Sequence, residues 1–148
     1  MRDTIQVLIR GDLDQRLEKS TQYSLELFEE NYGLASCQFD VYTRKVKNTA
    51  LYGCEPFAEH HFITFQLRKS SHYAIGYTSL GLYLKESKEV DGTHVRTIAE
   101  SFNVSDFLEI VRRLDETKTY NIVSYNCQNF VEEVEQNICN HIAEETHS

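Results

Sequence analysis

Four short segments in the middle of this chain alternate apolar and polar residues, and most of them are joined by short polar turns. They span residues 61–68, 72–79, 80–87 and 94–100. A period of two places the apolar side chains on one face of a β-strand. Strands in such close succession pair most simply as antiparallel neighbours, because only antiparallel strands can be joined by tight turns. The pattern predicts a small antiparallel meander.

Elements of other kinds flank this meander. A strand over 4–10, a helix that ends at Gly33 and a strand over 36–47 predict a leading β-α-β unit. A helix over 105–114 is expected to begin at Ser105 as its N-cap, and an extended run follows over 119–125. The last helix is expected to start near Cys127. The fold class is therefore α+β.

The chain of 148 residues is long enough for one domain with its own core. Within that single domain, 1–148, we expect an N-terminal β-α-β extension over 1–47, a core over 48–143 and a tail over 144–148. A net charge of −8 argues against binding to nucleic acid, which requires basic residues facing the phosphates. The sequence shows neither a long apolar run nor a signal peptide, so we expect no transmembrane anchor, a cytoplasmic location and reduced cysteines.

Cys127 is the most informative of the four cysteines. The final helix carries an apolar face that includes it, made by Cys127, Phe130, Val131, Val134, Ile138 and Ile142. Cys127 falls in the first turn, where unpaired N–H groups and the helix dipole stabilise a thiolate. Asn126 is a plausible N-cap. The alternative is that the thiol only fills the core, as most cysteines on apolar helix faces do.

A cysteine nucleophile needs a base, and that base is most often histidine. Among six histidines we favour His72, which opens a strand directly after a polar turn. His60 and His61 are expected in a loop or at a strand edge, where they lack the other ligands of a metal site. His94 is expected at an exposed strand end. We expect neither a metal nor a cofactor.

Two stretches together resemble a known family. "FITFQLRKSSHYAIGYTSLGLYL" and "YNIVSYNCQNFVEEV" look like the two signature boxes of the lecithin:retinol acyltransferase family. That family is a circularly permuted branch of the papain-like NlpC superfamily. Its members include phospholipid-acting acyltransferases and phospholipases, and the H-box/NC proteins of some picornaviruses. The resemblance covers roughly residues 60–138 and leaves the leading β-α-β unit unexplained.

The resemblance implies a role for each matching residue. It implies that Cys127 is the nucleophile, that His72 is the base, and that a small antiparallel sheet bearing the histidine packs on the cysteine helix. Tyr73 takes the place of the aromatic after the histidine, and with Asn126 it is expected to lie at the oxyanion or cap position. Family enzymes carry a polar third residue on the following strand, often a second histidine. This chain offers Tyr83, Lys85 and Glu86 there, none of the expected type, and of these we nominate Tyr83.

Two departures from the family pattern concern the rest of the chain. The stretch from His72 to Cys127 is short beside the cellular acyltransferases, and the chain ends without the hydrophobic anchor that cellular members carry. Together with the unusual third residue, these departures are typical of a shortened relative of the viral type.

Two functions therefore stay open. The first is a thiol hydrolase or acyltransferase that forms a thioester from an acyl-lipid ester, or from an amide in a protein substrate. The second is a catalytically inactive module that keeps the fold and binds a host or cellular protein.

Overall fold

A computed structural model describes residues 25–45, 59–68, 71–78, 81–118 and 126–147 of the chain. Within these ranges a helical stretch over 25–32 precedes a sheet and two further helices. The elements are β1 (Ser36–Lys45), β2 (Glu59–Arg68), β3 (Ser71–Thr78), β4 (Gly81–Ser87), β5 (Thr93–Asn103), α4 (Val104–Thr117) and α5 (Cys127–His147). The expected strand over 4–10 and the extended run over 119–125 lie outside the described residues.

The five strands form one sheet in the order β4-β3-β2-β1-β5, with every neighbouring pair antiparallel. Consecutive hairpins join β2 to β3 and β3 to β4, as the alternating segments predicted. β1 lies between β2 and β5, so the strand that was expected to close the leading β-α-β unit is an internal member of the same sheet. The predicted α+β class with a small antiparallel sheet and a C-terminal helix carrying Cys127 is confirmed.

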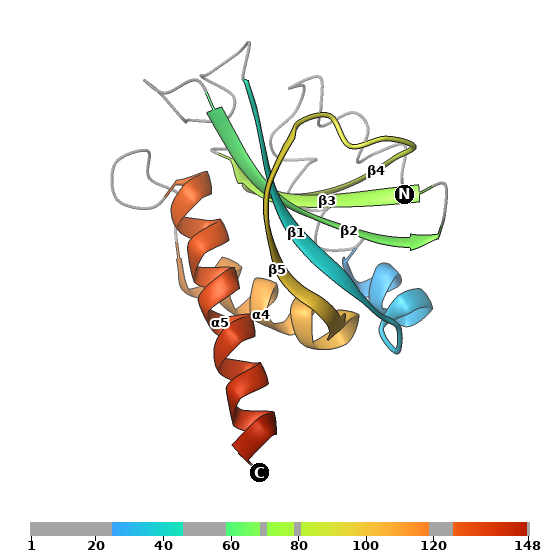
Figure 1. Cartoon of the computed structure of the whole chain (residues 1–148), viewed down its shortest axis with the longest axis vertical. Coiled ribbons are helices and arrows are strands. Elements are labelled where there is room, and N and C mark those ends of the chain that lie inside the picture. Colours follow the sequence, from blue (N-terminus) through green and yellow to red (C-terminus); the bar gives the residue numbers. More distant parts are fainter. Residues whose placement is uncertain (1–24, 46–58, 69–70, 79–80, 119–125, 148) are drawn as a thin grey trace.

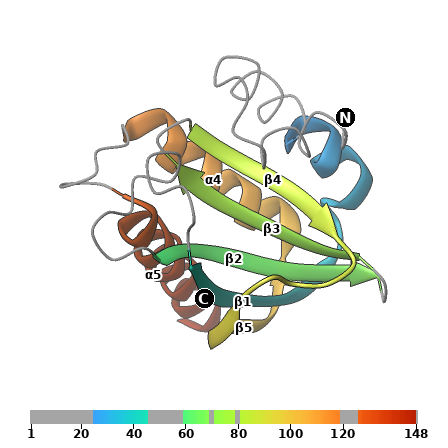
Figure 2. The same cartoon turned by 90° about the horizontal axis from the view of Figure 1, so that it is seen from above.

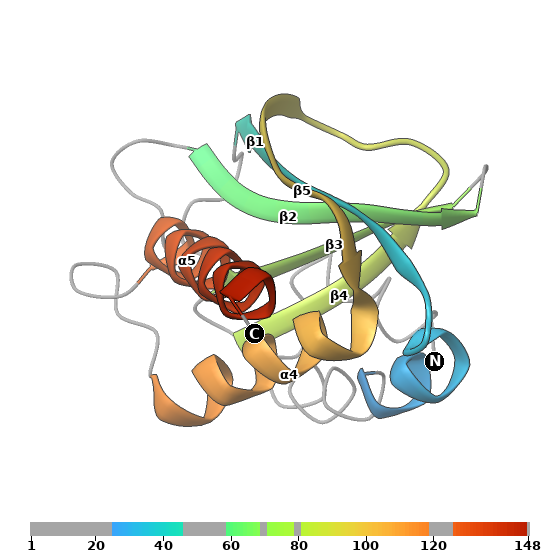
Figure 3. The same cartoon turned by 60° about the horizontal axis from the view of Figure 1, so that its bottom comes forward.

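Both long helices pack against one face of the sheet (Figures 1, 2 and 3). Phe107 of α4 lies with its ring centroid 4.4 Å from that of Phe39, and Phe130 of α5 stacks on Tyr77 at 5.2 Å. Strands β1 to β4 send alternate residues to this face, which makes them the centre of the hydrophobic core. These residues are Phe39, Val41, Ile63, Phe65, Ile75, Tyr77, Leu82 and Leu84.

The start of α4 differs from the sequence expectation. Asn103, not Ser105, is the N-cap, and its side-chain oxygen accepts a hydrogen bond from the Asp106 N–H at 3.0 Å. The Ser105 hydroxyl instead donates to the carboxylate of Glu29 in the helical stretch 25–32. Ser105 thus joins two helices across the molecule, while the asparagine two residues earlier performs the capping.

The C-terminal helix is longer than the face it buries. Phe130, Val131, Val134 and Ile138 are buried as predicted, but Ile142 is 36% exposed. Figure 1 shows the reason, since the last turns of α5 extend past the sheet. The helix continues to His147, through most of the segment that was expected to be a tail.

Candidate active site

Cys127 is the first residue of α5, and its position is fixed by the cap before it. The Asn126 side-chain oxygen accepts hydrogen bonds from the N–H groups of Gln128 at 3.0 Å and Asn129 at 3.3 Å. The Asn129 side chain returns a bond by accepting from the Asn126 N–H at 3.0 Å. This reciprocal arrangement resembles a capping box, with asparagine in place of the usual glutamate. It confirms Asn126 as the predicted N-cap.

The apolar face of α5 sets the direction in which Cys127 points. Phe130 and Val131, three and four residues later, are buried against the sheet, and a helix brings residues at these spacings onto one face. Cys127 therefore points toward the sheet and is only 2% exposed. The first turn of α5 lies beside the start of β2 (Figures 1 and 3).

His60 is the histidine that meets Cys127. It is the second residue of β2, and its side chain is fully buried. Burial lowers the pKa of His60 below its usual value of 6.5, and the interaction with the Cys127 side chain opposes this shift without cancelling it. The ring is therefore neutral at neutral pH, so it can accept a proton.

Tyr83 of β4 also contacts the His60 ring. The Tyr83 hydroxyl lies 2.7 Å from His60 Nε2, and the ring centroids are 5.7 Å apart. The two residues come from strands that are separated by β3. A thiol, a neutral imidazole and a phenol thus lie close together in the interior.

Gly76 makes this contact across β3 possible. It pairs with Phe62 of β2 on one side and with Tyr83 of β4 on the other. A Cβ atom at Gly76 would lie 2.7 Å from the nearest atom of the Tyr83 ring. The tyrosine ring therefore occupies the space that a side chain at this position would take.

The structure brings together three of the five residues that the sequence nominated. They are Cys127 and Asn126, which form the start of α5, and Tyr83, which contacts the histidine beside Cys127. That histidine is His60 and not His72. His72 opens β3 and pairs with Gln66, whereas Tyr77, near the far end of β3, packs on α5. Five residues of extended chain separate His72 from Tyr77, roughly 16 Å at the usual rise per residue.

Tyr73 also lies away from the thiol. Its ring packs among Phe28 and Phe65 at centroid distances of 4.8 and 5.6 Å. Its hydroxyl donates to Glu86 at 3.2 Å. Burial is the main cause that raises the Tyr73 pKa. Tyr73 is therefore a core residue beside the helical stretch 25–32, far from any oxyanion position next to Cys127.

The expectation that His60 lies in a loop or at a strand edge is wrong for a simple reason. β2 begins at Glu59, two residues before the predicted start, and an inner strand lies on each side of it. The signal was present in the sequence, since His60 is in phase with Phe62 and Thr64 in the alternation of this strand. The expectation that His94 lies at an exposed strand end is confirmed, because His94 is exposed at the start of β5.

Among the described residues, one group could offer three metal-ligand atoms close together. Atoms of Asp106, His141 and Glu145 lie within 4.8 Å of one another on α4 and α5. The His141 ring nitrogens lie 3.7 Å from Asp106 and 3.4 Å from Glu145, which are ordinary ion-pair distances. The group lies about 21 Å along α5 from Cys127, so it plays no part in the thiol site.

The described cysteines differ in environment. Cys37, Cys127 and Cys139 form no disulfide. Burial raises the pKa of Cys37 to about 12, whereas Cys139 is exposed on α5. Of the three, Cys127 is the one whose side chain interacts with a histidine, His60. Among the described helices, none combines the length and the apolar character needed to cross a membrane.

Comparisons with protein-family models, with curated proteins and with solved structures found no match to this chain.

Proposed function

We propose that this protein is a thiol-dependent acyl hydrolase or acyltransferase in which Cys127 is the nucleophile and His60 the general base. The observation that supports it is the buried contact between the Cys127 side chain and a neutral His60, itself bonded to Tyr83 at 2.7 Å. A nucleophile beside a base that a third group orients is the arrangement that activates a weak nucleophile.

In the proposed reaction, His60 takes the proton of the Cys127 thiol while the sulfur attacks an acyl carbonyl carbon. The carbon–oxygen or carbon–nitrogen bond of the substrate then breaks, and the leaving group takes the proton from His60. Water or an amine, deprotonated in turn by His60, attacks the resulting thioester and releases Cys127.

The start of α5 would stabilise the negative charge that develops on the substrate oxygen. Asn126 caps the N–H groups of Gln128 and Asn129. We assign the oxyanion to the backbone N–H of Cys127 itself, at the positive end of the helix dipole. Asn126 then acts by fixing the helix start and not by touching the substrate.

The order of these parts along the chain fits the permuted papain-like arrangement that the sequence resemblance implies. The base comes from a strand, and the nucleophile follows on the first turn of the last helix. On this basis we propose an acyl-lipid ester as the first substrate class and an amide in a protein as the second. A thiol nucleophile of this kind suits a reducing compartment such as the cytoplasm.

A second candidate is an inactive module that keeps this fold and binds a host or cellular protein. Burial favours it, because Cys127 is 2% exposed and His60 is fully buried. A substrate carbonyl must reach the sulfur, whereas a structural cysteine needs no access. The third residue is also a tyrosine, where the related enzymes carry a different polar residue.

The test is the pH dependence of Cys127 alkylation by iodoacetamide, followed by peptide mass spectrometry. The wild type is compared with His60→Gln and with His72→Gln as the matched control, after circular dichroism has shown that each variant is folded. The enzyme proposal predicts that Cys127 reacts at least tenfold faster than exposed Cys139 near neutral pH. His60→Gln should abolish this advantage, and His72→Gln should leave it unchanged.

An activated ester such as p-nitrophenyl butyrate completes the test. The proposal predicts a transient butyryl adduct on Cys127 that is absent from His60→Gln. Slow alkylation of Cys127 in the wild type, unaffected by His60→Gln and with no adduct, would overturn the enzyme proposal in favour of the binding module.

A further inference from the structure

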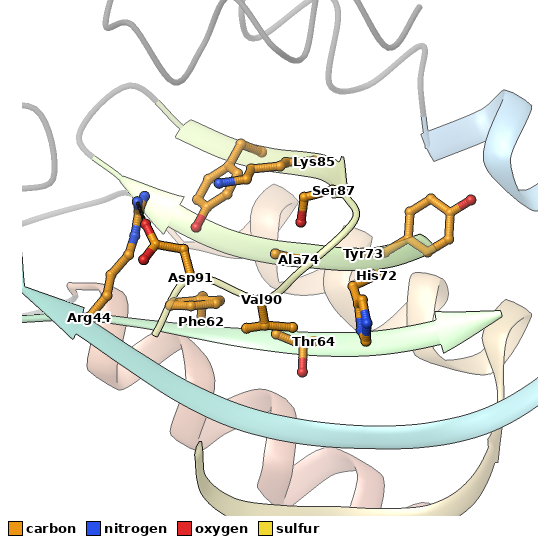
Figure 4. Close-up of a pocket in the computed structure, with 11 residues that line it drawn as sticks. Arg44, Phe62, Thr64, His72, Tyr73, Ala74, Lys85, Ser87, Val90 and Asp91 are labelled. Atoms are coloured by element: carbon orange, nitrogen blue, oxygen red, sulfur yellow. Dashed lines mark ion pairs between the residues drawn. The ribbon is translucent and has the colours of Figure 1, made fainter. Parts of the chain in front are cut away.

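A small pocket with several charged side chains in its lining lies on the sheet near the thiol site, away from α4 and α5. The lining includes Arg44 of β1, Phe62 and Thr64 of β2, His72 of β3, Lys85 of β4 and Asp91 of the β4–β5 connection (Figure 4). The space inside is about 10 Å³, room for one water molecule. The lining combines two cations with a single carboxylate.

Lys85 is the unusual member of this lining. Its side chain projects from β4 into the pocket (Figure 4), and the residue is only partly exposed. No carboxylate of the residues that the structure describes lies within ion-pair distance of the Lys85 amine. Burial, together with the nearby charge of Arg44, lowers the Lys85 pKa, and the more weakly acting Asp91 carboxylate opposes this shift. A half-buried lysine without a carboxylate at ion-pair distance is costly, because desolvation disfavours its charged form.

Arg44 is held in place beside it. Its side chain is 18% exposed, and its guanidinium carbon lies 5.8 Å from the centre of the Phe62 ring. An ion pair joins it to Asp91 at 3.6 Å, with the Asp91 side chain 81% exposed. The cation is therefore fixed by the sheet, while its carboxylate partner reaches in from solvent. A loose, exposed ion pair of this kind contributes little stability.

We infer that this pocket is a binding site for a small oxyanion, a carboxylate or a phosphate monoester, held jointly by Lys85 and Arg44. In the structure the Asp91 carboxylate occupies the position on Arg44 that we assign to the ligand. The pocket has no room for a second carboxylate, so the ligand must displace Asp91. The high exposure of Asp91 allows this displacement without rearrangement of the sheet.

The site adjoins the thiol chemistry through Tyr83, which lines this pocket and also contacts His60. If the proposed function holds, the oxyanion is the acidic group of the acyl substrate or the carboxylate of its product. That link rests on the proposed function, whereas the oxyanion site itself does not. A binding measurement in Cys127→Ser separates the two, since it removes the nucleophile and leaves both cations.

The experiment titrates ¹⁵N-labelled protein with sodium acetate and with methyl phosphate, against sodium chloride at matched ionic strength. Saturable shifts of the backbone amides at Lys85, Ser87 and Asp91 report binding. We expect Lys85→Gln to weaken binding at least tenfold. Asp91→Asn should tighten binding by up to about fivefold, which is the change in affinity expected when a weak surface ion pair no longer competes with the ligand. Lys88→Gln is the matched control, since Lys88 is exposed and does not line the pocket.

The two probes show which oxyanion the pocket prefers, and saturation by either one supports the site. Three results would overturn it. One is the absence of saturable shifts in both the wild type and Asp91→Asn. Another is equal weakening by Lys85→Gln and Lys88→Gln, which would indicate general charge attraction. The last is weaker binding in Asp91→Asn, because a carboxylate that the ligand displaces cannot contribute to binding of that ligand. Retained binding in a wild-type chain whose Cys127 shows no activated thiol would overturn only the proposed function.

Discussion

The Tyr83 hydroxyl reaches His60 Nε2 at 2.7 Å from two strands away. The contact passes over Gly76 of β3, where a Cβ atom would lie within 2.9 Å of three atoms of the tyrosine side chain. The phenol, the glycine and the histidine therefore form one unit. A change at any of them alters the environment of the imidazole that contacts Cys127.

Gly76→Ala tests this unit directly. The new methyl group should push the Tyr83 ring away from β3 and cost about 1–3 kcal/mol in the free energy of unfolding, the usual range for overpacking a core. Chemical denaturation measures this cost. In a Tyr83→Ala background the same substitution should cost much less, because the clashing ring is gone. Equal costs in both backgrounds would show that the ring does not lie over Gly76.

Tyr83→Phe separates the hydroxyl from the ring. It leaves the packing in place but removes the partner of a buried ring nitrogen, which should cost about 1–3 kcal/mol of stability. The ¹⁵N chemical shifts of the His60 ring should also move, because the hydrogen bond that biases its tautomer is lost. Tyr42→Phe is a comparable control on β1. Unchanged ring shifts in Tyr83→Phe would mean that the 2.7 Å contact does not form in solution.

Most of the sheet followed from the sequence because its strands are short, alternating and sequential. Each predicted segment of the meander became a strand, since a period of two leaves few other ways to bury Phe62, Ile75 or Leu84. The position of β1 did not follow, because strand order depends on long-range pairing that local pattern does not encode. The buried face of α5 ends at Ile138 and not at Ile142, because the sheet does not extend that far along the helix. Local sequence pattern does not encode this either.

The thiol site was half predictable for a related reason. Cys127 and Asn126 belong to one helix start, so their roles could be inferred from local rules. The choice among histidines depends on which strand end meets that helix start, a tertiary relationship. His72 lies in the sequence stretch that resembles the family. His60 alternates in phase with the buried residues Phe62 and Thr64, but it lies at a strand boundary, where sequence patterns are least reliable.

The buried state of His60 predicts loss of stability in mild acid. Burial lowers its pKa in the folded chain, so below about pH 6.5 the unfolded chain binds the proton more readily. The contribution is present above the unfolded pKa and is lost as the pH falls toward the folded value. Its slope is at most about 1.4 kcal/mol per pH unit. Urea denaturation from pH 7.5 to 5 measures it.

His60→Gln should flatten that pH dependence, because glutamine does not titrate. His61→Gln, one residue along the same strand, should retain the wild-type slope. A His60→Gln variant that is folded and still loses stability as steeply as the wild type would show that other groups govern the acid response.

Asn126→Ala tests the cap that fixes the start of α5. Loss of the two bonds from Gln128 and Asn129 to its side chain should cost about 1 kcal/mol in the free energy of unfolding. Gln128→Ala, at the exposed neighbouring position, should cost far less. Because Cys127 is the first residue of this helix, fraying there should also slow its alkylation relative to Cys139 if the helix start activates the thiol. Faster alkylation would instead mean that the cap serves to shield a buried thiol. Peptide mass spectrometry on both variants distinguishes a helix start that activates Cys127 from one that only buries it.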